Sequence, residues 1–206
     1  MKNIVLAFIL ALPLQLHAST LPFINELHYD NGGTDVGEGV EIAGASGTVL
    51  DGWSLLFYNG STGTIYRTLN LSGTIIDQGT GYGTLAFETG ALQNGAPDGI
   101  ALVDSNGSVQ QFLSYEGSFF ALEGAAIGLR STDIGIAESS DTPADWSLQL
   151  AGTGNAYEAF TWIATGNTFG QVNAGQSFTV VPVPASLPLL AGGLATLLRR
   201  KRCRNA

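Results

Sequence analysis

The sequence predicts an all-β domain built as an antiparallel β-sandwich. Hydrophobic residues recur with a period of two in short runs through the interior of the chain, which is typical of half-buried strands. Glycine-rich turns separate these runs, and the chain contains 28 glycines. No run before the C-terminal tail has the 3.6-residue period of an amphipathic helix. Together these observations favour two packed sheets over a helical or α/β architecture.

The first residues have the order of a secretory signal peptide. Lys2 supplies a positive charge, residues 4–16 are apolar, and Ala18 precedes Ser19 as the small residue of a cleavage site. We therefore expect residues 1–18 to direct export and to be removed.

Short strands and turns follow. The segments with the strand pattern are residues 21–29, 40–43, 53–58, 64–71, 83–87, 99–103, 109–115, 125–129, 146–150 and 159–163. Asn59-Gly60 and Asn106-Gly107 are the clearest turns, because both residue types tolerate positive φ. The second turn predicts an antiparallel pair between residues 100–103 and 109–113. Residues 131–145 are expected to form a surface loop, and residues 166–176 a terminal strand or a linker.

The C-terminal tail has three parts. An extended motif comes first, since proline fixes φ and lacks a backbone donor; it consists of Val181, Pro182, Val183, Pro184 and Ala185. The apolar run 185–198 is predicted to form a short hydrophobic helix. A basic cluster follows, made of Arg199, Arg200, Lys201, Arg202 and Arg204. The run is shorter than the roughly 20 residues that span a bilayer, so a buried helix is an alternative. The adjacent cations favour the membrane, with the basic cluster on the cytoplasmic side.

This tail resembles the PEP-CTERM class of bacterial sorting signals, in the variant that starts Val-Pro-x-Pro-Ala. Val183 stands where the commonest form has Glu. The resemblance implies recognition and cleavage by a membrane-embedded exosortase-type enzyme, after transient anchoring in the inner membrane. The expected organisation is a signal peptide over 1–18, a β-sandwich over 19–178 and a sorting tail over 179–206.

Charge is distributed unevenly between the domain and the tail. All 17 acidic residues lie between Glu26 and Glu158, and the only cations between residues 19 and 181 are Arg67 and Arg130, which gives this region a formal charge of −15. Such a domain is repelled by phosphate backbones, which disfavours direct nucleic-acid binding. Acidic surfaces instead attract divalent cations and basic partners. The single cysteine, Cys203, lies in the tail, so the domain has no disulfide.

The N-terminal part of the domain resembles a bacterial lamin-tail domain. Three motifs carry the resemblance in order: Asn25-Glu26, the run Val40-Glu41-Ile42, and Gly52-Trp53-Ser54-Leu55. The resemblance implies an immunoglobulin-like sandwich. Gly39 stands where that family has an aromatic residue, which leaves either a gap or room for a neighbouring side chain. We expect Trp53 and Leu55 to face the core, and Asn25 and Glu26 to bond to backbone at a sheet edge.

Four carboxylates in the same region form a candidate metal site: Asp30, Asp35, Glu38 and Glu41. They lie close in sequence without a neighbouring cation, and a hard ion such as Ca²⁺ would relieve their repulsion. The spacing does not match an EF-hand, since Asp35 stands where that loop needs glycine. A solvated acidic surface is the alternative.

The residue inventory gives no catalytic set. His28 is the only histidine after the signal peptide, which excludes multi-histidine zinc sites. We therefore expect a non-enzymatic protein of the cell surface or extracellular matrix, with an adhesion or scaffold role and with polysaccharide or surface protein as partner. The alternative is a metal-dependent secreted hydrolase, or a nuclease-associated accessory domain, that uses the acidic loop.

Overall fold

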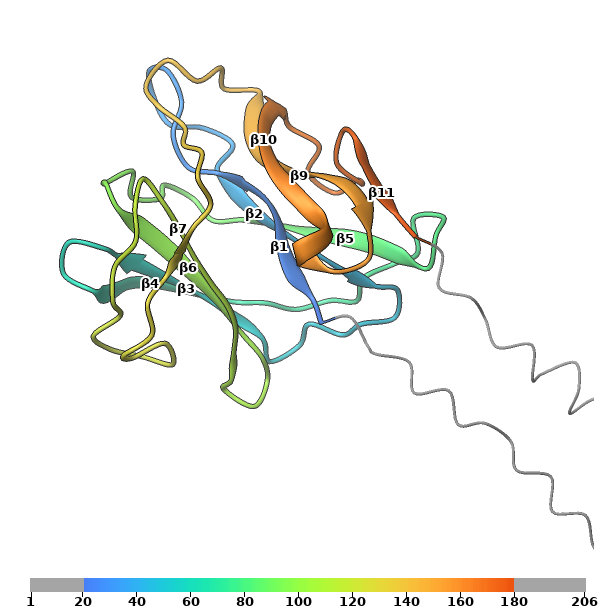
Figure 1. Ribbon diagram of the computed structural model, residues 1–206, viewed down its shortest axis with the longest axis horizontal. Helices are drawn as coiled ribbons and strands as arrows, with labels where there is room; N and C mark the ends of the chain where they lie inside the picture. Colours follow the sequence, from blue (N-terminus) through green and yellow to red (C-terminus); the bar gives the residue numbers. More distant parts are fainter. Residues whose placement is uncertain (1–20, 180–206) are drawn as a thin grey trace, which may run out of the picture. The chain divides into compact units, whose positions relative to one another are not determined.

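Two β-sheets make up the fold of the computed structural model, which describes residues 21–179 (Figure 1). The strands are β1 (Phe23–His28), β2 (Gly39–Ala45), β3 (Ser54–Asn59), β4 (Thr64–Asn70), β5 (Tyr82–Glu88), β6 (Asp98–Val103), β7 (Val109–Tyr115), β8 (Thr132–Asp133), β9 (Trp146–Gly154), β10 (Phe160–Gly166) and β11 (Gln176–Phe178). One 3₁₀ turn, η1 (Tyr157–Ala159), is the helical element of this part of the chain. The all-β prediction is confirmed. The predicted signal peptide, sorting motif, hydrophobic helix and basic cluster lie outside the described residues.

The first sheet, sheet 1, has the order β10-β9-β1-β2-β5, and all neighbours in this order are antiparallel. β11 joins it by pairing in parallel with the end of β9. β1 therefore lies in the middle of the sheet, between β2 and β9. A bulge between Ile24 and Glu26 shifts its register with β2. Since a bulge adds one residue to one strand, it changes which side chains face the core.

The second sheet, sheet 2, has the order β4-β3-β6-β7-β8 and is antiparallel except for the short parallel pair of β7 and β8. The predicted antiparallel pair across Asn106-Gly107 is confirmed, and the turn predicted at Asn59-Gly60 also joins an antiparallel pair, with the positive φ at Gly63. β3 pairs with β4 across the turn at Asn59-Gly60, and β6 pairs with β7 across the turn at Asn106-Gly107. Gly107 has φ +83°, the left-handed conformation that such a turn requires.

The main core lies between the sheets and gives a β-sandwich-like arrangement. Side chains of sheet 1 such as Ile24, Leu27 and Ile42 belong to one buried cluster with Leu55 and Phe57 of sheet 2. Each fully buried side chain of this size contributes roughly 1.5–3 kcal/mol relative to exposure. Leu55 is core, as expected, and Trp53 packs against the core at partial exposure.

Sheet 2 also has a buried outer face. Alternate residues of its strands form a second cluster, which includes Leu56 and Tyr58 of β3 and Phe112 of β7. Phe119 and Ala126, from the loop after β7, cover them. This loop is where the prediction of a strand over residues 125–129 is wrong: the segment forms turns, and Phe120 and Arg130 make only an isolated bridge.

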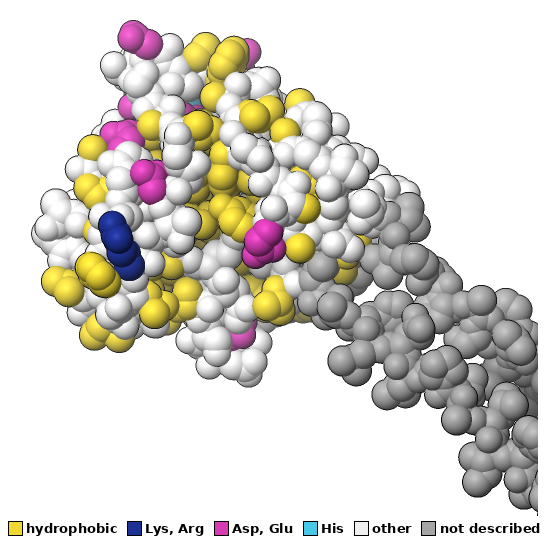
Figure 2. Space-filling view, viewed as in Figure 1, with side chains coloured by type: hydrophobic (Ala, Val, Ile, Leu, Met, Phe, Trp, Pro, Cys, Tyr) yellow, Lys and Arg dark blue, Asp and Glu magenta, His cyan; other side chains and the backbone are white. Residues whose placement is uncertain are grey.

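The same loop leaves apolar side chains at the surface. Phe120, Leu122 and Ile127 are 59%, 65% and 64% exposed. Figure 2 shows hydrophobic side chains at the surface of this face of the molecule, with acidic side chains scattered among them. Within residues 21–179, no helix has the length and apolar character needed to cross a membrane.

Candidate functional site

The four predicted metal ligands lie in different environments. Asp30 and Asp35 belong to the loop between β1 and β2, Glu38 ends that loop, and Glu41 is in the middle of β2. Asp35 is exposed, whereas Glu38 and Glu41 are 5% and 0% exposed. Among the described residues, no group of three or more His, Cys, Asp or Glu side chains is placed to hold a metal ion. Calcium at this loop stays a prediction.

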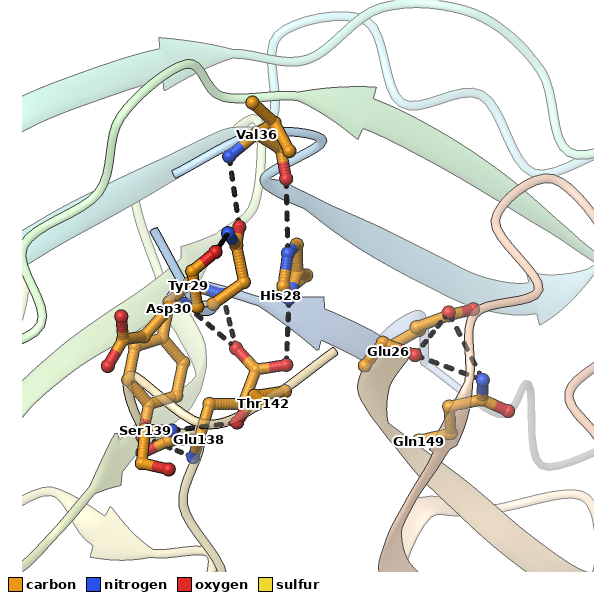
Figure 3. A network of polar contacts seen from close by, with 12 residues as sticks. Glu26, His28, Tyr29, Asp30, Val36, Glu138, Ser139, Thr142 and Gln149 are labelled. Carbon is orange, nitrogen blue, oxygen red and sulfur yellow. Dashed lines mark hydrogen bonds and ion pairs between the residues drawn. The ribbon is translucent and has the colours of Figure 1, made fainter. Parts of the chain in front are cut away.

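A carboxylate outside this set, that of Glu138, binds the end of β1 (Figure 3). Its Oε1 lies 2.8 Å from His28 Nδ1, and its Oε2 accepts the backbone N–H groups of Tyr29 at 2.6 Å and Asp30 at 3.0 Å. The other ring nitrogen, His28 Nε2, lies 3.1 Å from the carbonyl oxygen of Val36. Residues 131–145 were expected to be a surface loop, but Glu138 within them is only 3% exposed.

The surroundings of His28 favour its protonated form. Burial lowers the pKa of His28, but the hydrogen bond and charge of Glu138 outweigh it, so the pKa lies above its ordinary value. The geometry agrees, because a carboxylate and a carbonyl both accept and only the imidazolium donates from both nitrogens. Tyr29 extends the network to sheet 2, since its ring stacks on Tyr115 of β7 with centroids 3.7 Å apart. This network therefore joins two loops and both sheets.

A second network lies on the outer face of sheet 1. The bulge in β1 leaves Ile24 and Leu27 in the core, while the polar side chains of Asn25 and Glu26 bond on the other face. Asn25 and Glu26 are both 0% exposed. The expectation that they lie at a sheet edge is wrong, because β1 is a central strand. Their side chains bond mainly to side chains of neighbouring strands and of the loop 167–175, and the expected bond to backbone is present at Glu26, which accepts the N–H of Thr168.

Glu26 collects four hydrogen bonds. Its Oε1 accepts from Ser147 Oγ at 2.6 Å, Gln149 Nε2 at 3.3 Å and the backbone N–H of Thr168 at 2.8 Å. Its Oε2 accepts from Thr168 Oγ1 at 3.0 Å. Burial raises the pKa of Glu26, and these donors partly oppose the rise. Figure 3 shows Gln149 of β9 directed at this carboxylate.

Glu41 lies opposite Glu26 in the β1–β2 register. Its Oε1 accepts from Asn25 Nδ2 at 2.9 Å, and its Oε2 accepts the backbone N–H of Gly170 at 2.6 Å. Burial, with the nearby charge of Glu26 as a further cause, raises the pKa of Glu41 to about 8. Two buried carboxylates thus face each other across neighbouring strands, and both bind the loop 167–175.

Asn173 fastens the same loop to the sheet and is 3% exposed. Its Oδ1 accepts from Asn25 Nδ2 at 3.0 Å, and its Nδ2 donates to the carbonyl oxygens of Asn25 at 2.9 Å and Leu150 at 3.0 Å. Gln176, which starts β11, donates to Asn25 Oδ1 at 2.7 Å. The loop is therefore held by directional bonds to β1 and β9, and Val172 adds an apolar contact with the main core.

A pocket of about 500 Å³ opens beside this loop, at the start of β2 and the end of β5. We call it the Gly39 pocket; its lining includes Asp35, Glu38, Gly39, Glu88 and Phe169. A Cβ on Gly39 would lie 3.4 Å from Cζ of Phe169 and 3.0 Å from the carbonyl oxygen of Phe87. Of the two outcomes expected for the missing aromatic residue, the structure has the second: a neighbouring side chain, Phe169, lies against Gly39.

Glu38 is the buried acid of the Gly39 pocket. One carboxylate oxygen, Oε2, accepts the backbone N–H of Leu92. The other, Oε1, is buried and has no hydrogen-bond partner among the described residues. Burial raises the pKa of Glu38, and the charge of Asp35 raises it further, while His28 and Arg67 oppose the rise. The pocket therefore combines an aromatic side chain, a buried carboxylate with one unpaired oxygen and the exposed carboxylates of Asp35 and Glu88.

Of the four predicted metal ligands, Asp35 and Glu38 line the same pocket, and Asp30 and Glu41 lie elsewhere. The backbone N–H of Asp30 donates to Glu138, and the carboxylate of Glu41 accepts from Gly170 in the loop 167–175. The sequence did not indicate Glu138, Asn173 or Phe169 as site residues, because they are distant in sequence from the acidic loop. The loop 131–145 carries four acids, Asp133, Glu138, Asp141 and Asp145, so nothing in the sequence distinguishes Glu138 from the others.

Comparison of the chain with family models, with curated proteins and with solved structures gives no match.

Proposed function

We propose that this protein is an exported, non-enzymatic component of the cell surface or extracellular matrix. In this proposal an immunoglobulin-like, lamin-tail-type sandwich is delivered by an exosortase-type enzyme that reads the motif Val181, Pro182, Val183, Pro184 and Ala185. The domain then contributes adhesion or scaffold contacts to polysaccharide or to other surface proteins.

The observation that carries the proposal is the use of the buried acids. Five carboxylates accept backbone N–H groups of loops, and each thereby fixes a loop to a strand. They are Glu26, Glu38, Glu41, Asp98 and Glu138. A carboxylate that accepts backbone N–H groups is stabilised in place and contributes rigidity. His28 is engaged in the same way through Glu138 and Val36. These side chains support a rigid module rather than a reaction.

Delivery is tested by the mass of the exported protein. The full chain is produced in a bacterium with an exosortase-type enzyme and in a matched strain without it, and the envelope and matrix fractions are analysed by intact-mass spectrometry. We expect loss of the signal peptide in both strains and loss of the tail, from within residues 181–185 onward, only in the first. A Pro182→Ala, Pro184→Ala variant should keep its tail. An intact tail in both strains would overturn the proposed delivery.

The non-enzymatic part of the proposal is tested separately. The exported protein is assayed with polysaccharide and nucleic-acid substrates in the presence of Ca²⁺, Mg²⁺ or Mn²⁺. We expect no turnover. A divalent-dependent activity that is lost in both Glu38→Ala and Glu41→Ala would replace the scaffold proposal with the hydrolase alternative.

A further inference from the structure

The Gly39 pocket has features of a ligand site that the loop anchors do not have. At Glu26 and Glu41, both carboxylate oxygens accept hydrogen bonds from the protein itself. At Glu38 only Oε2 is used, and Oε1 is buried without a partner among residues 21–179, although the residue lines a pocket. A buried carboxylate oxygen without a donor is costly, by roughly 1–3 kcal/mol or more for a charged group, and a positive charge in the adjoining pocket would offset part of that cost.

The surrounding charges define the sign of the ligand. Asp35 and Glu88 add two exposed carboxylates to that of Glu38. Two cations act on Glu38: His28, which is already paired with Glu138, and Arg67, whose guanidinium donates to the carbonyl oxygen of Thr89. Three carboxylates against the one guanidinium leave the pocket negative. It will therefore attract a cation.

The size and lining of the pocket define the kind of cation. About 500 Å³ is a volume typical of small-molecule sites and far exceeds that of a single ion. The aromatic side chain of Phe169 and the small side chains of Ala86 and Ala91 line it beside the carboxylates. An aromatic ring attracts a cation through its face, and an apolar wall suits the methylene stem of a long charged side chain. No three acidic or histidine ligands among residues 21–179 converge as a metal ion would need.

We propose that the Gly39 pocket binds an organic cation, an ammonium or guanidinium group on an apolar stem, as presented by a lysine or arginine side chain of a basic polypeptide. The charged group lies beside the exposed carboxylates of Asp35 and Glu88, where its charge also stabilises the buried carboxylate of Glu38, and the stem packs against Phe169. The inference goes beyond the proposed surface role and does not depend on how the protein is delivered.

The test is a titration of the exported protein with matched small ligands, followed by calorimetry and ligand-observed NMR. The probes are Nα-acetyl-lysine amide, Nα-acetyl-arginine amide and the neutral, similarly shaped Nα-acetyl-norleucine amide. We expect at least one of the two cationic probes to bind with a Kd on the order of 1 mM, and more weakly as salt is added, while the neutral probe does not bind. Equal binding of the norleucine probe, or no binding of either cation, would overturn the proposal.

Variants assign the binding to this pocket. Glu38→Gln keeps an oxygen for Leu92 N–H and removes the charge, and we expect it to weaken binding about 10-fold or more. Asp35→Asn with Glu88→Gln changes only exposed side chains, so it tests the pocket even if Glu38→Gln does not fold. We expect this pair to weaken binding about 3-fold or more. Phe169→Leu keeps an apolar wall and removes the ring, with a loss of similar size.

The control matched to Glu38→Gln is Glu158→Gln, an exposed acid on η1 whose substitution likewise removes one negative charge. It should bind as the unmodified protein does. Binding that falls as much in Glu158→Gln as in Glu38→Gln would mean general attraction to an acidic surface and would overturn the pocket. Full displacement of the lysine probe by millimolar Ca²⁺ at constant ionic strength would overturn it in favour of a metal site.

Discussion

The two outer faces of the sheets are each covered by a loop, but with opposite chemistry. On sheet 2 the covering loop places Phe119 and Ala126 over Tyr58 and Phe112, an apolar cluster of close rings. On sheet 1 the loop 167–175 is fastened by the hydrogen bonds of Glu26, Glu41 and Asn173. Both outer faces are buried, so they show two ways of holding a loop on a sheet. We call the loop around Phe119 and Ala126 the apolar cover and the loop 167–175 the polar cover.

The difference lies in what a small displacement costs. Apolar contacts are not directional, so the cover of sheet 2 can shift and repack with limited loss. A shift of the loop 167–175 would leave buried donors and acceptors unpaired, which costs roughly 1–3 kcal/mol for each group. The polar cover therefore fixes the position of the loop, and with it the position of Phe169 in the Gly39 pocket. The apolar cover mainly adds stability.

The largest expected effect is on the pH dependence of the polar cover. The folded state raises the pKa of Glu41 from 4.5 to about 8, so it holds a proton that the unfolded chain releases. Stability should fall as pH rises from about 4.5 to about 8, by at most about 5 kcal/mol for this group at about 1.4 kcal/mol per pKa unit. In Glu41→Gln, which cannot ionise, the free energy of unfolding in urea should change much less over this range.

Exposed acids provide the control for that comparison. Glu158→Gln should follow the pH profile of the unmodified protein, because its side chain is exposed. If the stability of Glu41→Gln and of the unmodified protein depended on pH in the same way, Glu41 would be ionised in the folded protein without cost. The two covers would then not differ in their electrostatics.

The apolar cover is broken by Phe119→Ala. Phe119 is 8% exposed and its ring lies edge-on to that of Phe112, with centroids 5.3 Å apart. Its truncation should lower the free energy of unfolding by about 4 kcal/mol, as is usual for a buried phenylalanine. The neighbouring Phe120 is 59% exposed, so Phe120→Ala should cost less than about 0.5 kcal/mol. Equal losses in urea denaturation would mean that the ring of Phe119 does not carry the cover.

The sequence predicted the strands under the apolar cover better than the loops that cover the two sheets. Short apolar runs predicted the strands of sheet 2, because residues such as Leu55 and Leu56 face two apolar layers, so that consecutive and not only alternate positions are apolar. The loop that supplies Phe119 was misjudged as a strand over 125–129, since apolar residues in a turn-rich covering loop look like a short strand in the sequence.

The polar cover could not be predicted from the sequence. A bulge in β1 places Asn25 and Glu26 on the same network, and nothing in the alternation of residues marks a bulge. The partner Asn173 is 148 positions away from Asn25, in a loop without a hydrophobic pattern. Buried acids also contradict the usual rule that charged residues are exposed, so Glu41 was interpreted as a metal ligand.

Asn173→Ala tests whether the hydrogen bonds of the polar cover fix the position of the loop 167–175. It removes the acceptor of Asn25 Nδ2 and the donor to the carbonyl oxygens of Asn25 and Leu150, all within a buried network. We expect a loss of about 3 kcal/mol in urea denaturation. We also expect faster amide hydrogen exchange at Gly170, which would separate loss of loop position from a uniform loss of stability. Asn167→Ala is the control, because Asn167 is exposed and bonds through its backbone. Unchanged exchange at Gly170 relative to other amides would mean that the polar bonds do not position the loop.

The smallest expected effect is that of calcium on stability. The four acids of the N-terminal region predict a calcium site, but the hydrogen bonds of Glu41 in the polar cover disfavour binding there. Both oxygens of Glu41 already accept hydrogen bonds, from Asn25 and Gly170, so binding a metal there would first break them. Asp35 is exposed and can contribute only a weakly fixed ligand. We therefore expect no resolvable rise in Tm on addition of millimolar CaCl₂ at constant ionic strength, since the stabilisation by a ligand is small while its concentration stays well below its Kd. A rise of several degrees that disappears in Asp35→Asn and in Glu41→Gln would show that the loop gives up the polar cover to bind a metal, and it would reverse the assignment of Glu41 from loop anchor to ligand.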